Sequence, residues 1–156
     1  MLEQLFANYP VNVKAMMRNL IQTAADLGLP FGERKKTYNS RLAQELGLWC
    51  ESKNKGDAFH MRAFRAYFVD GKNIAKISVL VDLAASIALP RKEAVSILAT
   101  RAFKAAVDAD WSLSQEKAIT AVPTFVMNHD KLVGAQPYEM LERLMKAHGV
   151  KKRKET

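Results

Sequence analysis

The chain has 156 residues, of which 49% are hydrophobic and 26% are charged, a composition typical of one folded domain and unlike that of a disordered protein. Its apolar runs, such as residues 77–83, fall short of the roughly 20 residues that a membrane helix needs. The first ten residues do not have the pattern of a secretory leader. A single cysteine, Cys50, excludes an internal disulfide, so we expect a cytoplasmic protein without a membrane partner.

The net charge of +8 raises the question of a nucleic-acid partner. The basic residues are scattered along the expected helices, and several of them sit in the tail 150–156. A solvated basic surface therefore explains the charge better than a nucleic-acid face, and specific nucleic-acid binding is not expected.

Helical patterns dominate the chain up to about residue 118. Apolar residues recur at spacings of three and four after Asn12, which predicts a helix capped by Asn12 and stopped by Gly28. Further helices are expected at about 40–53, at 58–70 with Asp57 as the cap, and at 77–88 before Pro90. Residues 91–118 predict a short helix that breaks near Thr100 and a longer one through Trp111.

The period changes after Thr120. The segments TFVMN and KLVGA are rich in β-branched and apolar residues, and the turn-forming residues 128–130 separate them, which predicts a β-hairpin. Pro137 is expected at the first position of a last helix, which Gly149 ends. The inner face of this helix is expected to consist of Tyr138, Leu141, Leu144 and Met145. The fold class is thus mainly α with a small β-hairpin, an α+β arrangement.

Few residues carry a recognisable catalytic pattern. The histidines His60, His129 and His148 lie in separate elements without further ligands at metal-binding spacing, so no metal site is expected. Cys50 falls in the C-terminal half of a helix, where the helix dipole disfavours a thiolate, and a buried structural thiol is the better interpretation. We expect no catalytic residue and no cofactor.

The dipeptide Val122-Pro123 stands out because proline cannot donate a hydrogen bond to a strand. A cis peptide here would expose neighbouring main-chain groups, which an extended ligand could use. A trans proline that merely begins the strand is an equally good interpretation of the local sequence.

Four segments of the sequence form a recognisable set: LGLPFGERKKTYNSRLAQEL, FRAYFVDGKNI, VDADW and TAVPTFVMNHDKLVGAQPYEMLERL. Together they resemble the DsbA-like thioredoxin-fold family, in particular the FrnE-type dithiol–disulfide isomerases. The relatives of that branch include 2-hydroxychromene-2-carboxylate isomerase and kappa-class glutathione transferase. The resemblance implies a helical insertion over about 1–118, a ββα thioredoxin remnant over 119–149 and a basic tail over 150–156. It also implies a cis Pro123, with Val122 and Thr124 beside it in a peptide- or thiol-binding loop.

Family members carry a C-x-x-C motif in a first β-α-β unit, and this sequence has no such motif. We therefore expect a truncated relative without disulfide exchange of its own, which retains the binding loop. The alternatives are a non-catalytic binding or dimerisation module and a glutathione-using isomerase or transferase. The lost first strand would leave an open edge on the hairpin, so a homodimer is expected to form through Thr124, Phe125, Val126, Met127 and Asn128.

Overall fold

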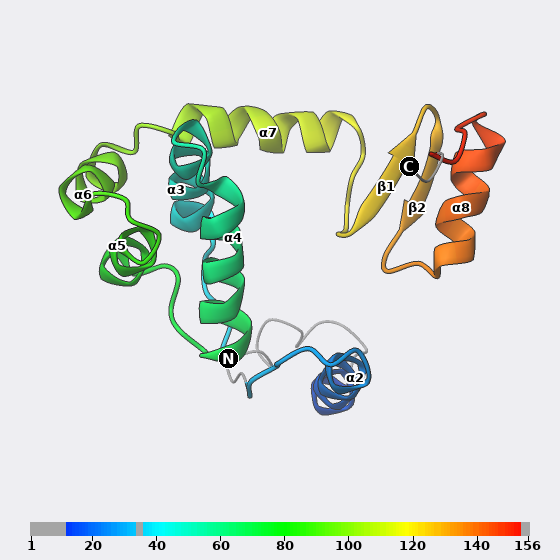
Figure 1. Ribbon diagram of the computed structural model, residues 1–156, viewed down its shortest axis with the longest axis horizontal. Coiled ribbons are helices and arrows are strands. Elements are labelled where there is room, and N and C mark those ends of the chain that lie inside the picture. The colour runs from blue at the N-terminus through cyan, green and yellow to red at the C-terminus, as the bar shows by residue number, and fades with distance from the viewer. Residues whose placement is uncertain (1–11, 34–35, 154–156) are drawn as a thin grey trace. The chain divides into compact units, whose positions relative to one another are not determined.

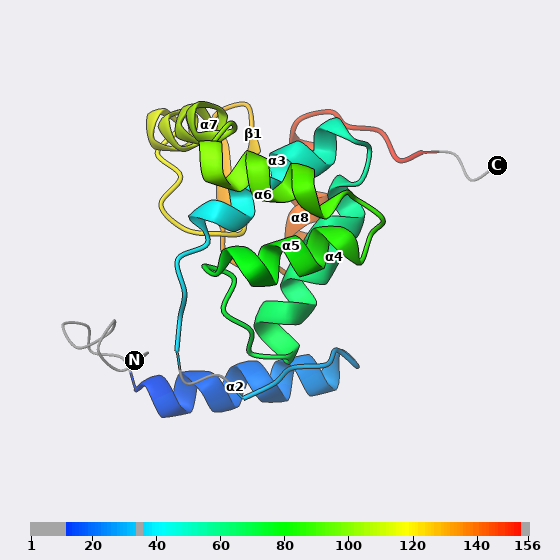
Figure 2. The same cartoon turned by 90° about the vertical axis from the view of Figure 1, so that its left-hand side faces the viewer.

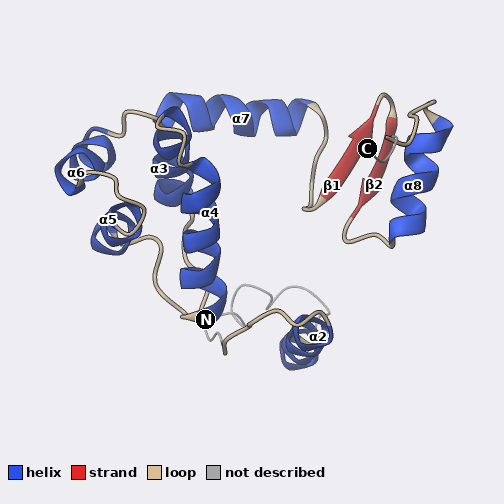
Figure 3. Ribbon diagram, in the orientation of Figure 1, coloured by secondary structure: helices blue, strands red, loops and turns tan. Residues whose placement is uncertain are grey.

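The structure, a computed structural model, describes residues 12–33 and 36–153 and contains helices and one small antiparallel sheet (Figure 1, Figure 3). The expected fold class, mainly α with a small β-hairpin, is confirmed. The chain divides into two compact units, residues 1–107 and 108–156.

The first unit is helical. It contains α2 (Val13–Asp26), α3 (Arg41–Ser52), α4 (Gly56–Phe64), η1 (Arg65–Val69), α5 (Ile77–Ala85), α6 (Arg91–Thr100) and the start of α7 (Lys104–Glu116). Helices α3, α4, α5 and α6 contact one another, and Figure 2 shows them gathered together. The last helix of this series ends at Glu116, close to position 118, where we expected the helical part to end.

A hydrophobic core forms where these four helices meet. Leu46, Phe59, Leu80 and Leu98 come from α3, α4, α5 and α6, and each is at most 1% exposed. Each helix therefore contributes one large apolar side chain to the same interior. The burial of these side chains is the main favourable contribution to folding in this unit.

The ends of the helices follow local capping chemistry. The side chain of Asn12 accepts a hydrogen bond of 3.0 Å from the amide of Ala15, and Gly28 adopts a positive φ of 66° after α2, as expected. The expectation for Asp57 was wrong, because α4 begins at Gly56 and Asp57 lies inside its first turn. There its carboxylate lies at the positive end of the helix dipole.

Helix α4 does not continue as a regular α-helix. After Phe64 the backbone forms the π-helix η1, in which the amide of Asp70 donates to the carbonyl of Arg65 at 3.0 Å. The sequence predicted one uninterrupted helix over 58–70. Short π-helical segments of this kind occur frequently at functional sites.

One charged side chain is buried among the apolar ones. Glu45 in α3 is 1% exposed and accepts hydrogen bonds from the guanidinium of Arg101 at 2.7 and 2.5 Å. Arg41 lies one turn before it, at 3.2 Å. The hydrogen bonds from Arg101 outweigh the effect of burial and lower the pKa of Glu45. Arg101 ends α6 with a left-handed φ of 54°, so the carboxylate binds the residue that terminates another helix.

The second unit contains the hairpin and the last helix. Strands β1 (Thr124–Met127) and β2 (Asp130–Val133) pair antiparallel, and Asn128 takes a positive φ of 53° in the turn. Helix α8 (Tyr138–Ala147) begins one residue later than expected, because Pro137 precedes it rather than occupying its first position. Leu141 and Leu144 are half-buried, whereas Tyr138 and Met145 are 67% and 44% exposed, so the expected inner face is only partly correct.

Candidate functional site

The loop that leads into the hairpin has a defined shape. The peptide bond between Val122 and Pro123 is cis, the geometry that the resemblance implies. The hydroxyl of Thr124 donates to the carbonyl of Ala121 at 2.6 Å and closes the loop on itself. Val122 is 87% exposed, so the loop presents an aliphatic side chain to solvent.

The hydrogen bonds of the hairpin determine which main-chain groups remain free. The amide of Gly134 donates to the carbonyl of Pro123 at 2.7 Å, so Pro123 and Gly134 are a hydrogen-bonded pair of the ladder. Such pairs alternate along an antiparallel ladder, and in the observed register the next ones are Phe125 with Leu132 and Met127 with Asp130. The N–H and C=O groups of Thr124 and Val126 consequently point away from β2.

These groups form an open strand edge within the hairpin unit. In the described part of the chain, β2 is the only strand that pairs with β1. The edge runs directly from the exposed loop 121–124, and Val126 on it is 43% exposed. An extended backbone could add to this edge as a third strand while its side chains contact Val122 and Val126.

The far end of the hairpin is held by a histidine whose role the sequence did not reveal. Nδ1 of His148 lies 3.0 Å from the side-chain nitrogen Nδ2 of Asn128, and its Nε2 lies 3.0 Å from Oδ2 of Asp130. A neutral imidazole protonated on Nε2 satisfies both contacts, because Nδ1 then accepts and Nε2 donates. The three side chains thus tie the end of α8 to the turn. His148 is about 20 residues away from Asn128 and Asp130 in the sequence, so no local sequence pattern indicated this contact.

The other chemically reactive side chains belong to other elements of the chain. Cys50 is fully buried in α3, and burial, with a smaller effect of Glu51, raises the pKa of its thiol to about 12. His60 lies 3.6 Å from Glu51, and His129 is exposed in the hairpin turn. Within residues 12–33 and 36–153, no three His, Cys, Asp or Glu side chains are placed to hold a metal ion. No helix in those same ranges has the length and apolarity required to cross a membrane.

The predicted site residues therefore fall into two groups. Val122, Pro123 and Thr124 form the exposed loop, and residues 124–127 form the strand with the open edge, while Asn128 belongs to the turn. Thr124 belongs to both groups. Its side chain closes the loop, and its main-chain N–H and C=O groups point away from β2. Their roles in binding or dimerisation remain predictions.

Comparison with known proteins identifies the family of the chain. Over 112 residues it is 32% identical to the uncharacterized protein YwbO of Bacillus subtilis, an alignment that covers 71% of this chain and 56% of YwbO. The chain thus spans little more than half the length of that relative. It also superposes on the crystal structure of a probable DsbA oxidoreductase from Streptomyces coelicolor with a TM-score of 0.82 and 26% identity, covering 99% of this chain and 70% of the other. The family model of the DSBA-like thioredoxin domain matches residues 3–146, and the chain therefore belongs to the DSBA-like thioredoxin domain family.

Proposed function

We propose that this relative of the thiol–disulfide oxidoreductases binds an extended peptide at the loop 121–124 and the edge of β1, and that it does not exchange disulfides by itself. The observation that carries the proposal is the outward direction of the main-chain groups of Thr124 and Val126, beside the exposed Val122. Strand addition provides affinity through the main chain, and specificity comes from alternate side chains of the peptide.

The state of the cysteine supports the second half of the proposal. Disulfide exchange begins with attack by a thiolate, and a dithiol enzyme needs a second thiol to resolve the mixed disulfide. The sequence holds one cysteine, and its thiol is buried with a pKa of about 12. At neutral pH such a thiol is almost entirely protonated and has no access to a substrate.

Peptide binding can be tested with a pair of matched proline variants. The probe is a fluorescein-labelled hexapeptide of alternating valine and threonine with one central cysteine, together with its serine analogue. Val126→Pro removes an N–H that points away from the hairpin on the β1 edge. Val133→Pro removes an N–H that points away from it on β2, because Thr124 and Val133 are a non-hydrogen-bonded pair.

We expect fluorescence anisotropy to show that Val126→Pro weakens peptide binding by about fivefold or more, the loss of roughly one hydrogen bond. Val133→Pro should bind like the wild type. Equal effects of the two variants, or no binding of either peptide at about 1 mM, would contradict the proposed edge. Far-UV circular dichroism establishes that both variants retain the wild-type helix content.

Reduction of insulin by a thiol donor tests the absence of disulfide exchange. The rate with the protein should equal the rate with the donor alone, and Cys50→Ser should leave it unchanged. A rate above the donor background that Cys50→Ser abolishes would refute this half of the proposal. This result would not affect the proposal that the protein binds a peptide.

A homodimer is the second candidate, and the exposure of the second unit favours it. None of the described residues between 108 and 153 is fully buried, and Phe125, Val126 and Val133 are 37–52% exposed. Antiparallel pairing of residues 124–128 with their own copy about a two-fold axis would turn two hairpins into one four-stranded sheet. The open edge and the exposed apolar side chains would then both be covered.

Sedimentation analysis at increasing protein concentration tests the dimer. Val126→Glu places a carboxylate on the edge and opposite Lys131 of the same hairpin, so it should preserve the hairpin and repel a second copy. Val133→Glu, on β2, is the control and should remain dimeric. A wild-type protein that stays monomeric at micromolar concentration would rule out the dimer without affecting peptide binding.

A further inference from the structure

The helical unit contains a groove of its own. It runs between the loop after α2 and the segment formed by α4 and η1, and its volume is about 620 Å³. Its walls are almost entirely apolar and include Leu29, Phe31, Met61, Phe64 and Phe68. Both the volume and the lining are typical of pockets that bind small organic molecules.

The loop side of the groove is fixed by main-chain contacts. The amide of Gly32 donates to the carbonyl of Phe68 at 2.9 Å, and the rings of Phe31 and Phe68 are 6.0 Å apart. A Cβ atom at position 32 would overlap the carbonyl oxygen of Val69, so the close approach of the loop to η1 requires a glycine. The wall made by Phe31 is therefore held in place before any ligand arrives.

The helix side of the groove exposes large apolar side chains. Both Met61 and Phe64 belong to α4, and their exposed fractions are 68% and 56%. Contiguous apolar surface of this kind marks binding sites on soluble domains. Methionine and phenylalanine can follow the shape of an aliphatic or aromatic ligand.

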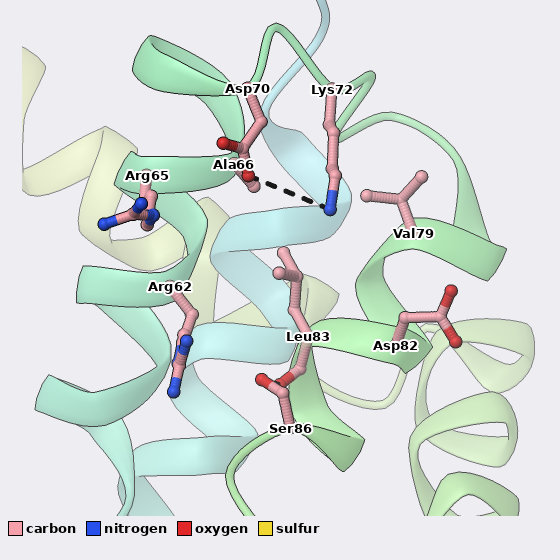
Figure 4. A pocket seen from close by; sticks show the side chains of 9 residues that line it. All are labelled: Arg62, Arg65, Ala66, Asp70, Lys72, Val79, Asp82, Leu83 and Ser86. Atoms are coloured by element: carbon pink, nitrogen blue, oxygen red, sulfur yellow. Dashed lines mark hydrogen bonds and ion pairs between the residues drawn. The ribbon is translucent and has the colours of Figure 1, made fainter. Parts of the chain in front are cut away.

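The rim of the groove carries two guanidinium groups. Arg62 and Arg65 line the apolar groove and also a smaller polar pocket of about 290 Å³ beside it, which Leu83 of α5 and Ser86, directly after α5, line as well (Figure 4). They are three residues apart, a spacing that places side chains on the same side of a helix.

The carboxylates of the polar pocket are already engaged with other cations. Asp82 pairs with Arg91 at 2.6 Å, and Asp70 pairs with Lys72 at 3.8 Å, the contact drawn in Figure 4. Neither Arg62 nor Arg65 forms an ion pair with any residue of the described ranges. Among the described residues, the boundary between the apolar groove and the polar pocket is consequently lined by two guanidinium groups without a carboxylate partner.

We propose that this groove binds an amphiphilic carboxylate, a small molecule with one apolar body and one carboxylate group. The apolar body lies against Met61, Phe64 and Phe68, and the carboxylate is bound by Arg62 and Arg65, whose planar donor groups match its two oxygens. A neutral amphiphile fills the same groove without the rim interaction. A cationic amphiphile is repelled by the rim. This site is independent of the loop 121–124.

The test uses decanoate, with decanol and decyltrimethylammonium as probes of equal chain length, each below the concentration at which it forms micelles. Binding is followed by NMR of protein labelled with ¹³C at the methionine methyl groups, because the Met61 signal reports on the groove itself. Decanoate should shift this signal and bind about tenfold more tightly than decyltrimethylammonium. Absence of a shift at about 1 mM decanoate, or equal affinity for the two ions, would overturn the proposal.

Two double variants separate the rim from the general charge of the protein. Arg62→Gln/Arg65→Gln should abolish the preference for decanoate over decyltrimethylammonium while leaving decanol binding unchanged. Lys14→Gln/Arg18→Gln removes the same charge from exposed positions of α2 that do not line the groove, and it should retain the preference. Equal behaviour of the two double variants would show that the rim does not recognise the carboxylate.

Discussion

The two units of the chain differ in how they bury their side chains. The helical unit encloses Leu46, Phe59, Leu80 and Leu98, whereas the hairpin unit has no fully buried side chain among its described residues. A two-stranded hairpin is marginally stable in water, and one helix beside it adds little core. The helical unit therefore has a buried core of its own, whereas the described side chains of the hairpin unit all stay at least partly exposed.

The difference in burial between the two units can be tested by replacing one leucine in each with alanine. The largest change in the free energy of unfolding is expected here. Leu46→Ala removes a fully buried side chain and should lower the free energy of unfolding by about 3–4 kcal/mol. Leu132→Ala removes a half-buried side chain from β2 and should cost about 1 kcal/mol. Urea denaturation followed by circular dichroism measures both. A loss at Leu132 as large as that at Leu46 would show that the hairpin is buried in an assembly.

A smaller effect is expected from the buried carboxylate of the helical unit. Glu45→Gln breaks the charged hydrogen bonds to Arg101 and should destabilise the protein by about 2–3 kcal/mol, below the range for pairs in which both groups are buried. Glu93→Gln is the control, because Glu93 forms an exposed pair with Lys53 at 3.2 Å and should cost less than about 1 kcal/mol.

The effect at Glu45 should also depend on pH. Folding lowers the pKa of Glu45, so its stabilising contribution is fully present above the pKa of an ordinary glutamate and is lost as the pH falls through the folded value. The difference in unfolding free energy between the wild type and Glu45→Gln should therefore shrink in acid. A difference that stays constant down to the acid transition would contradict the assignment.

The smallest effect should come from the histidine that ties α8 to the hairpin. His148→Ala removes the contacts to Asn128 and Asp130 and should weaken the hairpin by about 0.5–1 kcal/mol. Hydrogen exchange at the β1 and β2 amides should then accelerate about two- to fivefold, with no change at the core helices. His129→Ala, in the exposed turn, is the matched control. Equal acceleration by both variants would mean that His148 does not hold the turn.

The amino-acid sequence predicted the elements better than the contacts between them. Periodic apolar residues and stops such as Gly28 depend on neighbours along the chain, so the order of helices, hairpin and last helix could be anticipated. The pair Glu45–Arg101 and the contact of His148 with Asp130 join residues far apart in the sequence. No local pattern encodes them.

In the candidate sites too, local features were predicted from the sequence and features that depend on distant contacts were not. The loop 121–124 was noticed because Val122-Pro123 is unusual within a strand pattern. The groove beside Phe64 was missed, because an apolar residue in a predicted helix does not by itself show whether its side chain is buried or exposed. Exposure of Phe64 depends on how the loop 29–33 crosses the helix, and that crossing rests on the hydrogen bond between Gly32 and Phe68.

The π-helix η1 makes the groove sensitive to the number of residues rather than to their identity. A π turn accommodates one residue more than an α turn, and each residue of an α-helix advances the side-chain direction by about 100°. Deleting one residue within Arg65–Val69 should therefore restore a regular helix and rotate the side chain that follows. Phe68 would turn away from Phe31, and Arg62 would remain in place without the aromatic wall behind it. Deletion of a single residue in η1 is thus expected to remove the groove, although the amino-acid sequence of α4 stays unchanged.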